Sequence, residues 1–215
     1  MDPRDEEEEE EDVFIIMEKA HCTLLDDINQ RRARRQPYDT EETLEIFRDS
    51  VEALSYCATA GVAHCDIKPS NILLVQDSNK RTGFAVRMSD FGTSIQISEE
   101  RSEQLIYKES IFRNVNKFMT PLYASPSIVQ KVPVINYYQE DVFSLGLTFL
   151  QVLNLYSSEE LANMNINGHN SEVPVSQPDL SRCPFLLRHL VSRMLSDDSD
   201  KRPSFLELRE ILRAP

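Results

Sequence analysis

The chain has 215 residues, of which 40% are hydrophobic, and a formal net charge of −13. This length and composition can bury a substantial core without disulfide or metal crosslinks, which excludes a wholly disordered chain and favours one domain. The negative charge gives no support for a nucleic-acid partner. A membrane span is not expected either, because the longest apolar passage, residues 142–155, is short and interrupted by polar residues.

An acidic leader opens the chain. Residues 5–12 carry eight acidic side chains in a row. Such a run cannot bury apolar surface, so we expect residues 1–12 to be disordered. No apolar stretch follows a basic start, as it would in a signal peptide. The four cysteines lack metal-binding spacing and suit a reducing compartment, which predicts a cytoplasmic or nuclear protein.

Helical periodicity dominates the rest of the chain. Asp39 and Thr40 form a helix cap, after which apolar residues recur at helical spacing until Gly61. Further helices are expected at residues 24–34, 140–154, 184–195 and 203–213. The basic run at residues 31–35 fits the solvated end of the first of these helices better than a nuclear-import patch.

A short hairpin is predicted after the helix that ends near Gly61. Residues 71–75 and 85–88 are typical of strands and are joined by a polar turn. The expected fold is therefore α+β, with a mainly helical lobe that carries this hairpin. Because a hairpin returns the chain to its start, Asp90 should lie near Asn71. Carboxylate and amide oxygens suit Mg²⁺, which shares its coordination with water and substrate phosphates.

The segments on either side of the hairpin have the pattern of a phosphoryl-transfer site. They read His64-Cys65-Asp66-Ile67-Lys68-Pro69-Ser70-Asn71 and Ser89-Asp90-Phe91-Gly92. Phosphoryl transfer needs a carboxylate beside the attacking hydroxyl and ligands for the metal on the nucleotide. Asp66 can provide the carboxylate, and Asn71 and Asp90 can bind the metal.

These motifs resemble the large C-terminal lobe of a eukaryotic protein kinase of the serine/threonine type. That family has the catalytic-loop pattern H-R-D-x-K-x-x-N and the metal-binding pattern D-F-G. Further matches follow in family order: Thr120–Pro126 resembles the segment that closes the activation loop, and Asp141–Gly146 resembles the start of the buried central helix. Arg202 resembles the late structural arginine. The resemblance predicts one kinase-like domain over residues 13–215.

The resemblance also implies roles for individual residues. Asp66 would be the catalytic base and Lys68 would contact the γ-phosphate of ATP, while Asn71 and Asp90 would bind Mg²⁺. Structural support would come from His64, Phe91, Gly92, Thr120, Asp141 and Arg202. Within that set, the His64 ring would pack against Phe91, and Asp141 would hydrogen-bond the backbone of the catalytic loop.

Little of a small N-terminal lobe is recognisable. Residues 13–18 resemble its last strand, which leads into the hinge, but no glycine-rich loop, strand lysine or helix glutamate stands before them. A truncated small lobe is therefore expected. The ATP contacts would be Met17, Glu18 and Ala20 at the hinge, with Leu73 under the adenine. A partner protein would be needed to cover the apolar surface left open.

Two residues depart from the family pattern. Cys65 stands where many kinases have an arginine that pairs with a phosphate on the activation loop, so phosphorylation between Asp90 and Ser127 is not expected to be a switch. Ser127 stands where the family has glutamate, which removes the expected partner of Arg202. An unpaired buried charge is costly. Either another acid such as Asp200 replaces it, or this region is looser than in active relatives.

Two functions follow from these observations. In the first, the protein is a serine/threonine kinase that transfers the γ-phosphate of MgATP to a hydroxyl group of a protein substrate. In the second, it is a non-catalytic kinase-like lobe, or a fragment, that acts as a binding module. The retained site residues support the first function, and the unrecognised small lobe and Ser127 support the second.

Overall fold

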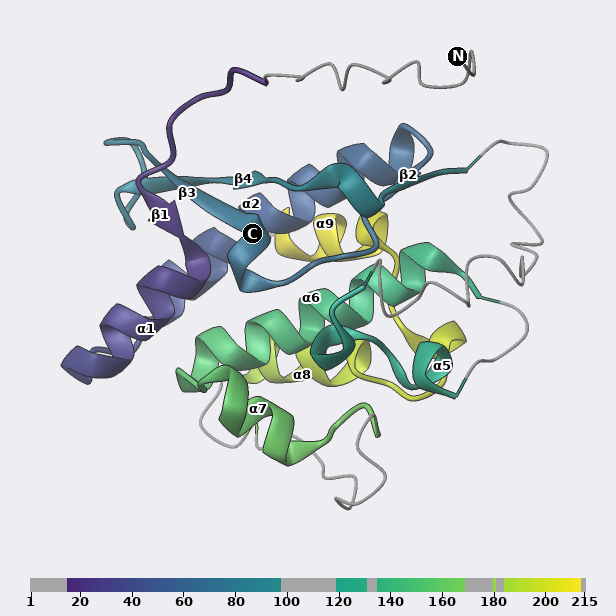
Figure 1. The fold of residues 1–215 in the computed structure, drawn as a ribbon. Coiled ribbons are helices and arrows are strands. Elements are labelled where there is room, and N and C mark those ends of the chain that lie inside the picture. The colour runs from purple at the N-terminus through teal and green to yellow at the C-terminus, as the bar shows by residue number, and fades with distance from the viewer. Residues whose placement is uncertain (1–14, 98–118, 131–134, 169–179, 181–183, 214–215) are drawn as a thin grey trace, which may run out of the picture.

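The computed structural model describes residues 15–97, 119–130, 135–168, 180 and 184–213. Helices dominate this described part of the chain (Figure 1). They are α1 (Leu24–Arg34), α2 (Thr40–Thr59), α5 (Pro126–Val129), α6 (Tyr137–Asn154), α7 (Ser158–Met164), α8 (Phe185–Met194) and α9 (Phe205–Arg213). The predicted α+β class, with a mainly helical lobe, is confirmed. The predicted helix ends are close to the observed ones, and the start of α6 differs most, at residue 137 instead of 140.

Side-chain caps start the first two helices. Thr23 and Asp39 each accept a hydrogen bond from the backbone three residues later, and the acids there, Asp26 and Glu42, bond back to the cap backbone. These reciprocal bonds satisfy amide groups that a helix cannot satisfy itself. The predicted cap at Asp39 is therefore confirmed, and α2 runs from it directly toward the catalytic loop.

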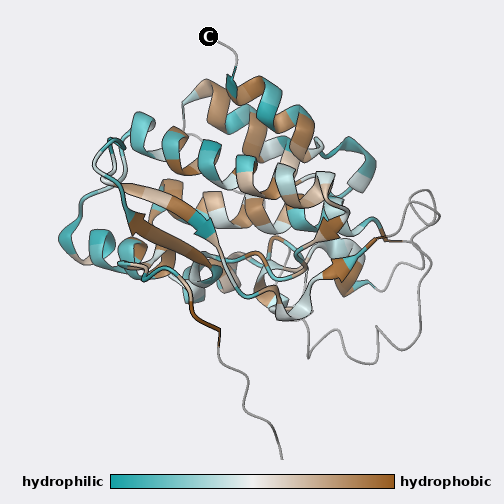
Figure 2. Cartoon of the chain, turned by 90° about the horizontal axis from the view of Figure 1, so that it is seen from above, coloured by the Kyte–Doolittle hydropathy of each residue, from teal (hydrophilic) through white to brown (hydrophobic). Residues whose placement is uncertain are grey.

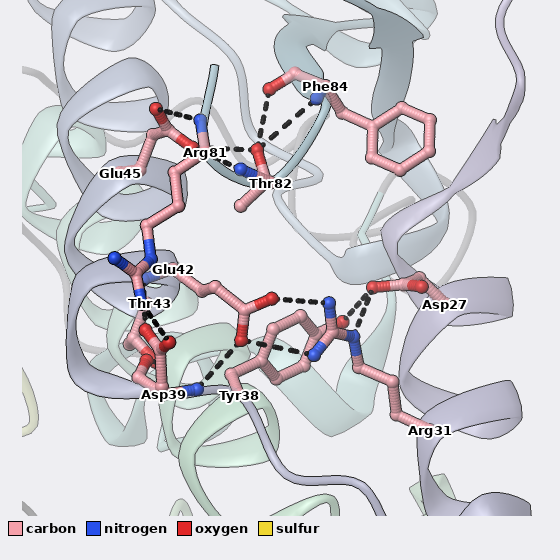
Figure 3. Close-up of polar contacts among 10 residues, drawn as sticks. All are labelled: Asp27, Arg31, Tyr38, Asp39, Glu42, Thr43, Glu45, Arg81, Thr82 and Phe84. Carbon is pink, nitrogen blue, oxygen red and sulfur yellow. Dashed lines mark hydrogen bonds and ion pairs between the residues drawn. The ribbon is translucent and has the colours of Figure 1, made fainter. Parts of the chain in front are cut away.

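A polar cluster joins α1 to α2 (Figure 3). The Arg31 guanidinium lies 2.9 Å from a Glu42 carboxylate oxygen and 3.1 Å from an Asp27 oxygen. It also lies 4.0 Å from the centre of the Tyr38 ring. The basic run at residues 31–35 is thus the end of α1, and its first arginine anchors this helix to its neighbour.

Helix α6 forms the centre of the core. Phe149 of α6 and Phe47 of α2 are fully buried, and their ring centroids are 4.1 Å apart. Gly146 allows α8 to approach, because a Cβ atom there would lie 3.0 Å from the Met194 Cβ. Helices α2 and α9 lie side by side, as do α6 and α8 (Figure 1). Hydrophobic residues run through these helices and the paired strands (Figure 2).

The hairpin lies in a three-stranded antiparallel sheet. Its strands are ordered β1 (Cys22–Thr23), β3 (Ile72–Gln76) and β4 (Phe84–Met88). The predicted hairpin is confirmed, with strand ends shifted by one residue. Ile72 pairs with Met88, and the next residue, Ser89, donates its amide to the Asn71 carbonyl at 2.9 Å. The hairpin therefore brings the residues before and after it to one end of the sheet.

Two further contacts hold the hairpin and its neighbouring loops. Glu45 of α2 accepts hydrogen bonds from Arg81 and Thr82 in the hairpin turn (Figure 3). In a separate two-stranded sheet, β2 (Val62–Ala63) pairs with β5 (Ile95–Gln96), which ties the chain before the catalytic loop to the chain after the Asp-Phe-Gly motif. Both ends of the candidate site are thus fixed by backbone pairing.

The predicted strand at residues 13–18 is wrong over its described part. Residues 15–18 have no regular structure, and the side chains of Ile15, Ile16 and Met17 are 78%, 98% and 65% exposed. A strand needs a neighbour for its backbone groups, and the described sheets place none beside this segment. Residues 13 and 14 and the predicted acidic leader at residues 1–12 lie outside the described residues.

None of the helices in the described ranges combines the length and apolarity required to cross a membrane.

Candidate active site

The Asp66 carboxylate is the centre of the candidate site. It is 8% exposed, and both of its oxygens accept hydrogen bonds. The amide and hydroxyl of Thr120 donate to one oxygen at 3.1 and 2.8 Å, and the Lys68 ammonium and Asn71 amide donate to the other at 2.6 and 3.1 Å. Burial opposes ionisation of Asp66, but the bonds from Lys68 and Thr120 outweigh it and hold its pKa below the usual range. The carboxylate is therefore charged at neutral pH, as a general base must be.

Lys68 and Asn71 fix the shape of the loop around this carboxylate. The Lys68 ammonium bridges Asp66 and the Thr120 hydroxyl, which lies 2.7 Å away. Asn71 ends a short 3-10 turn, Pro69–Asn71, and its amide group also donates to the Asp66 carbonyl at 2.9 Å. Residues two and five positions after Asp66 thus return to it, as the spacing of the motif predicted.

Helix α6 holds the loop from below through Asp141. One oxygen of this buried carboxylate accepts the His64 amide at 2.6 Å, and the other accepts the Cys65 amide at 2.8 Å. Cys65 has a φ of 67°, in the left-handed region that non-glycine residues seldom adopt. Burial raises the pKa of Asp141 to about 7, although the two amides favour its charged form. The contact between Asp141 and the loop backbone is the one that the resemblance implied.

The His64 ring links this loop to the chain before Asp90. Its Nε2 lies 3.0 Å from the Ser89 carbonyl, and its Nδ1 lies 3.3 Å from the Asp66 amide nitrogen. These partners assign the neutral tautomer that donates from Nε2 and accepts at Nδ1. The ring centroid is 4.7 Å from that of Phe91. His64 therefore packs where the resemblance placed it and uses both nitrogens.

Asn71 and Asp90 are the residues that the resemblance implies as Mg²⁺ ligands. Asn71 is buried, and Asp90 is exposed with a φ of 62°. At Gly92 an added Cβ atom would lie 3.4 Å from an Asp90 carboxylate oxygen, an ordinary van der Waals distance, so the space there does not itself require a glycine. The described residues contain no group of three or more His, Cys, Asp or Glu side chains that could hold a metal ion. An amide oxygen and a carboxylate nevertheless suit Mg²⁺, which takes its other ligands from phosphates and water.

The expected ATP contacts are only partly brought together. Leu73 is half-buried in β3, and Ala20 leads into β1, which pairs with β3. Met17 and Glu18 are exposed, and the Glu18 carboxylate lies 3.5 Å from the Arg87 guanidinium of β4. The structure therefore places Leu73 in the central strand and Ala20 just before the edge strand that pairs with it, but leaves Met17 in solvent.

Comparison with known proteins identifies the family. The sequence pattern described as "Protein kinase domain" matches residues 4–214, nearly the whole chain. The chain belongs to the protein kinase family. The recognition made from the catalytic-loop and Asp-Phe-Gly motifs is confirmed.

Several kinases are similar to this chain. Serine/threonine-protein kinase pakE of Dictyostelium discoideum is 24% identical over 92% of the chain and 19% of that protein. CBL-interacting protein kinase 4 of Oryza sativa subsp. japonica is 29% identical over 88% of the chain and 38% of that protein. The interferon-induced, double-stranded RNA-activated protein kinase of Rattus norvegicus is 26% identical over 93% of the chain and 35% of that protein. The chain thus spans less than two fifths of the length of these relatives.

Arg202 has a buried acidic partner that differs from the kinase pattern. Its guanidinium lies 3.2 Å from the Glu140 carboxylate, and both side chains are at most 1% exposed. Another acid therefore replaces the missing glutamate, as one alternative expected, but it is Glu140 and not Asp200, which is exposed. Sequence reasoning missed Glu140. The available signal was an acid at the start of an apolar helix, directly before Asp141.

The neutral state of His64 predicts a pH dependence of stability. Burial lowers the pKa of His64 below its ordinary value of 6.5. The unfolded chain therefore takes up this proton first, and the stabilisation present above pH 6.5 is lost as the pH falls toward the folded pKa. We expect the free energy of unfolding to fall more steeply between pH 7.5 and 5.5 than it does in His64→Phe, by at most about 1.4 kcal/mol per pH unit.

Denaturant titrations at several pH values would measure this difference. His64→Phe retains an aromatic ring beside Phe91 and removes only the titrating group and its hydrogen bonds. His189→Gln is the matched control, because His189 is exposed on α8. Equal slopes for the parent chain and His64→Phe would contradict the prediction.

Proposed function

We propose that the chain transfers the γ-phosphate of ATP to a serine or threonine hydroxyl of a protein substrate. The observation that carries this proposal is the hydrogen-bonded group of Asp66, Lys68 and Asn71, with Asp90 at the same end of the hairpin as Asn71. Bound Mg²⁺ would neutralise charge on the nucleotide phosphates, and Asn71 and Asp90 would hold it. The protein's own part is to position the reactants and the charges around them.

Asp66 would orient the attacking hydroxyl and accept its proton. Its carboxylate is ionised and is held in one orientation by Thr120 and Lys68. Lys68, whose ammonium is already beside this carboxylate, would contact the transferred phosphoryl group. ATP would lie against Leu73 and Ala20, with Met17 and Glu18 contributing from the preceding segment. The relatives' printed names support serine or threonine as the acceptor.

Transfer of labelled γ-phosphate to a generic protein substrate tests this function. With Mg²⁺ present, we expect transfer by the 215-residue chain and a rate about 10²–10⁴-fold lower for Asp66→Asn, the usual contribution of a general base. Asp197→Asn makes the same chemical change at an exposed position and should transfer at the parent rate. If the parent chain shows no more transfer than Asp66→Asn, the kinase proposal for this chain fails.

Regulation by phosphorylation of the activation loop is not part of the proposed mechanism. Cys65 replaces the arginine that would pair with such a phosphate, and it is 3% exposed with a thiol pKa raised by burial. Four of the hydroxyl residues between Asp90 and Ser127 lie outside the described residues: Ser98, Ser102, Tyr107 and Ser110. We expect phosphatase treatment to change the transfer rate less than twofold. Cys65→Ser also lacks a cation at this position, so phosphatase treatment should change its rate equally little. A several-fold change on dephosphorylation would contradict this expectation.

A binding module is the second candidate function, and an open groove favours it. A cavity of about 800 Å³ lies between α2 and the hairpin, and its lining combines apolar residues such as Val86 and Met88 with charged ones such as Asp49 and Arg87. Tyr56 and Phe91 at its edge are 77% and 44% exposed. A partner protein would cover this face. Phosphate transfer by the isolated chain would show that binding is not its sole function. Transfer that appears only when a partner protein is added would show that the chain is both a kinase and a binding module.

A further inference from the structure

The first turn of α6 carries an acid with two buried partners. One oxygen of Glu140 accepts a hydrogen bond from Arg202 at 3.2 Å, and the other accepts one from the Ser125 hydroxyl. The three residues are 1%, 3% and 0% exposed, in the order Glu140, Arg202, Ser125. A carboxylate taken out of water in this way is retained only when its partners compensate for the loss of hydration.

The Ser125 partner connects Glu140 to the candidate active site. Ser125 caps α5 by accepting the amides of Ser127 and Ile128 at 3.1 and 3.4 Å. Five residues before Ser125, Thr120 donates both its amide and its hydroxyl to Asp66. A short segment therefore has one end attached to Glu140 and the other end attached to the Asp66 carboxylate.

The residue after Glu140 supports the same loop from the opposite side. Asp141 accepts the amides of His64 and Cys65, which directly precede Asp66. Two consecutive residues of α6 thus act on Asp66, one through its backbone neighbours and one through the segment 120–125. A change in the first turn of α6 would reach the carboxylate by both routes.

The Arg202 partner explains why this arginine can stay buried although Ser127 replaces the expected glutamate. Its Nε donates to the Ser196 carbonyl at 2.9 Å, and its Nη1 donates to the Gln139 carbonyl at 3.0 Å. Glu140 is the acid in contact with it among the described residues. The Arg202 Nη2 is buried and has no hydrogen-bond partner in the described part of the chain. The kinase resemblance implies a glutamate at position 127 as the partner of this arginine, and the open Nη2 leaves a donor for such an acid.

We propose that Glu140 supplies from α6 the acid missing at Ser127 and is a positioning residue for Asp66, acting through Ser125 and Thr120. The effect of Glu140 on catalysis rests on the proposed kinase function. The anchoring of segment 120–125 by Glu140 stands without that function. Because the segment bonds to the Asp66 carboxylate, which is proposed to orient the acceptor hydroxyl, its loosening should affect the protein substrate more than ATP.

Two single variants separate the two partners of Glu140. Ser125→Ala removes one hydroxyl and leaves the pair with Arg202 intact. Glu140→Gln weakens both contacts. In each, amide hydrogen exchange in residues 119–126 should accelerate at least about tenfold, while Glu159→Gln, an exposed acid on α7, should exchange as the parent chain does. Unchanged exchange in both Ser125→Ala and Glu140→Gln would overturn the proposal, whether or not the chain transfers phosphate.

A rescue variant tests the replacement of the missing acid. Glu140→Gln/Ser127→Glu returns one carboxylate to the side of Arg202, so we expect its thermal midpoint to recover toward that of the parent. No recovery, with Glu140→Gln itself folded and destabilised, would contradict the replacement.

Kinetics would then separate positioning from general stability. At a temperature where all variants are folded, Ser125→Ala should raise KM for the protein substrate or lower kcat by about tenfold and leave KM for ATP within twofold. Parallel changes in both KM values would instead indicate a merely structural role. If the parent chain is inactive, the kinase proposal fails, and hydrogen exchange still decides whether Glu140 anchors the segment.

Discussion

Replacing Asp141 by alanine should lower the free energy of unfolding by about 2–6 kcal/mol. The substitution leaves the buried amides of His64 and Cys65 without an acceptor, and each unsatisfied buried group costs about 1–3 kcal/mol. Cys65 also keeps a left-handed backbone conformation that these bonds help to hold. Removal of a buried carboxylate relieves some desolvation, which favours the lower part of this range.

Denaturant unfolding would measure the loss, and Asp141→Asn is the graded control. The asparagine amide oxygen can accept only one of the two backbone bonds, so this variant should lie between the parent and the alanine variant. Because Asp66 follows Cys65 directly, Asp141→Ala should also lower phosphate transfer in conditions where it is fully folded. A loss of less than 1 kcal/mol for alanine would show that Asp141 does not hold the loop.

Replacing Phe149 by alanine should cost about 3–5 kcal/mol, the usual range for a buried phenylalanine. Its ring packs on Phe47 with a centroid distance of 4.1 Å, and both side chains are fully buried. The pair joins α2, which leads into the catalytic loop, to α6, which carries Asp141. The expected loss is a large part of the stability of a typical domain, about 5–15 kcal/mol.

A double-mutant cycle with Phe47→Leu and Phe149→Leu would test whether these residues act together. Leucine fills part of the space, so each single variant should unfold at lower denaturant but remain cooperative. Because the two rings are in contact, the loss of unfolding free energy in the double variant should differ from the sum of the two single losses by about 0.5–1.5 kcal/mol. Additive losses would show that the ring contact contributes no more than burial of each side chain.

Local patterns were enough to predict most of the helices and the hairpin. Asp39 caps α2 with its own side chain, and apolar residues at helical spacing form the buried face that follows. The turn between β3 and β4 likewise pairs segments only a few residues apart. These features depend on neighbours in the sequence, which is why reading the chain in order recovers them.

The strand expected at residues 13–18 failed for the opposite reason. Ile15 and Ile16 have strong strand-forming character. A strand nevertheless requires a partner to accept and donate its backbone hydrogen bonds. Whether such a partner stands beside it is a property of the assembled sheet. In the described residues that partner is not β3, which pairs with β1 and β4.

By itself, the sequence determined the family and the residues of the catalytic loop, because Asp66, Lys68 and Asn71 lie within six positions and their spacing brings them together. Only the tertiary structure decided their more distant partners. Thr120 reaches Asp66 across 54 positions, and Arg202 reaches Glu140 across 62. Contacts over such separations depend on how α6 packs against the rest of the chain, and several acids are equally available to a buried arginine until that packing selects one.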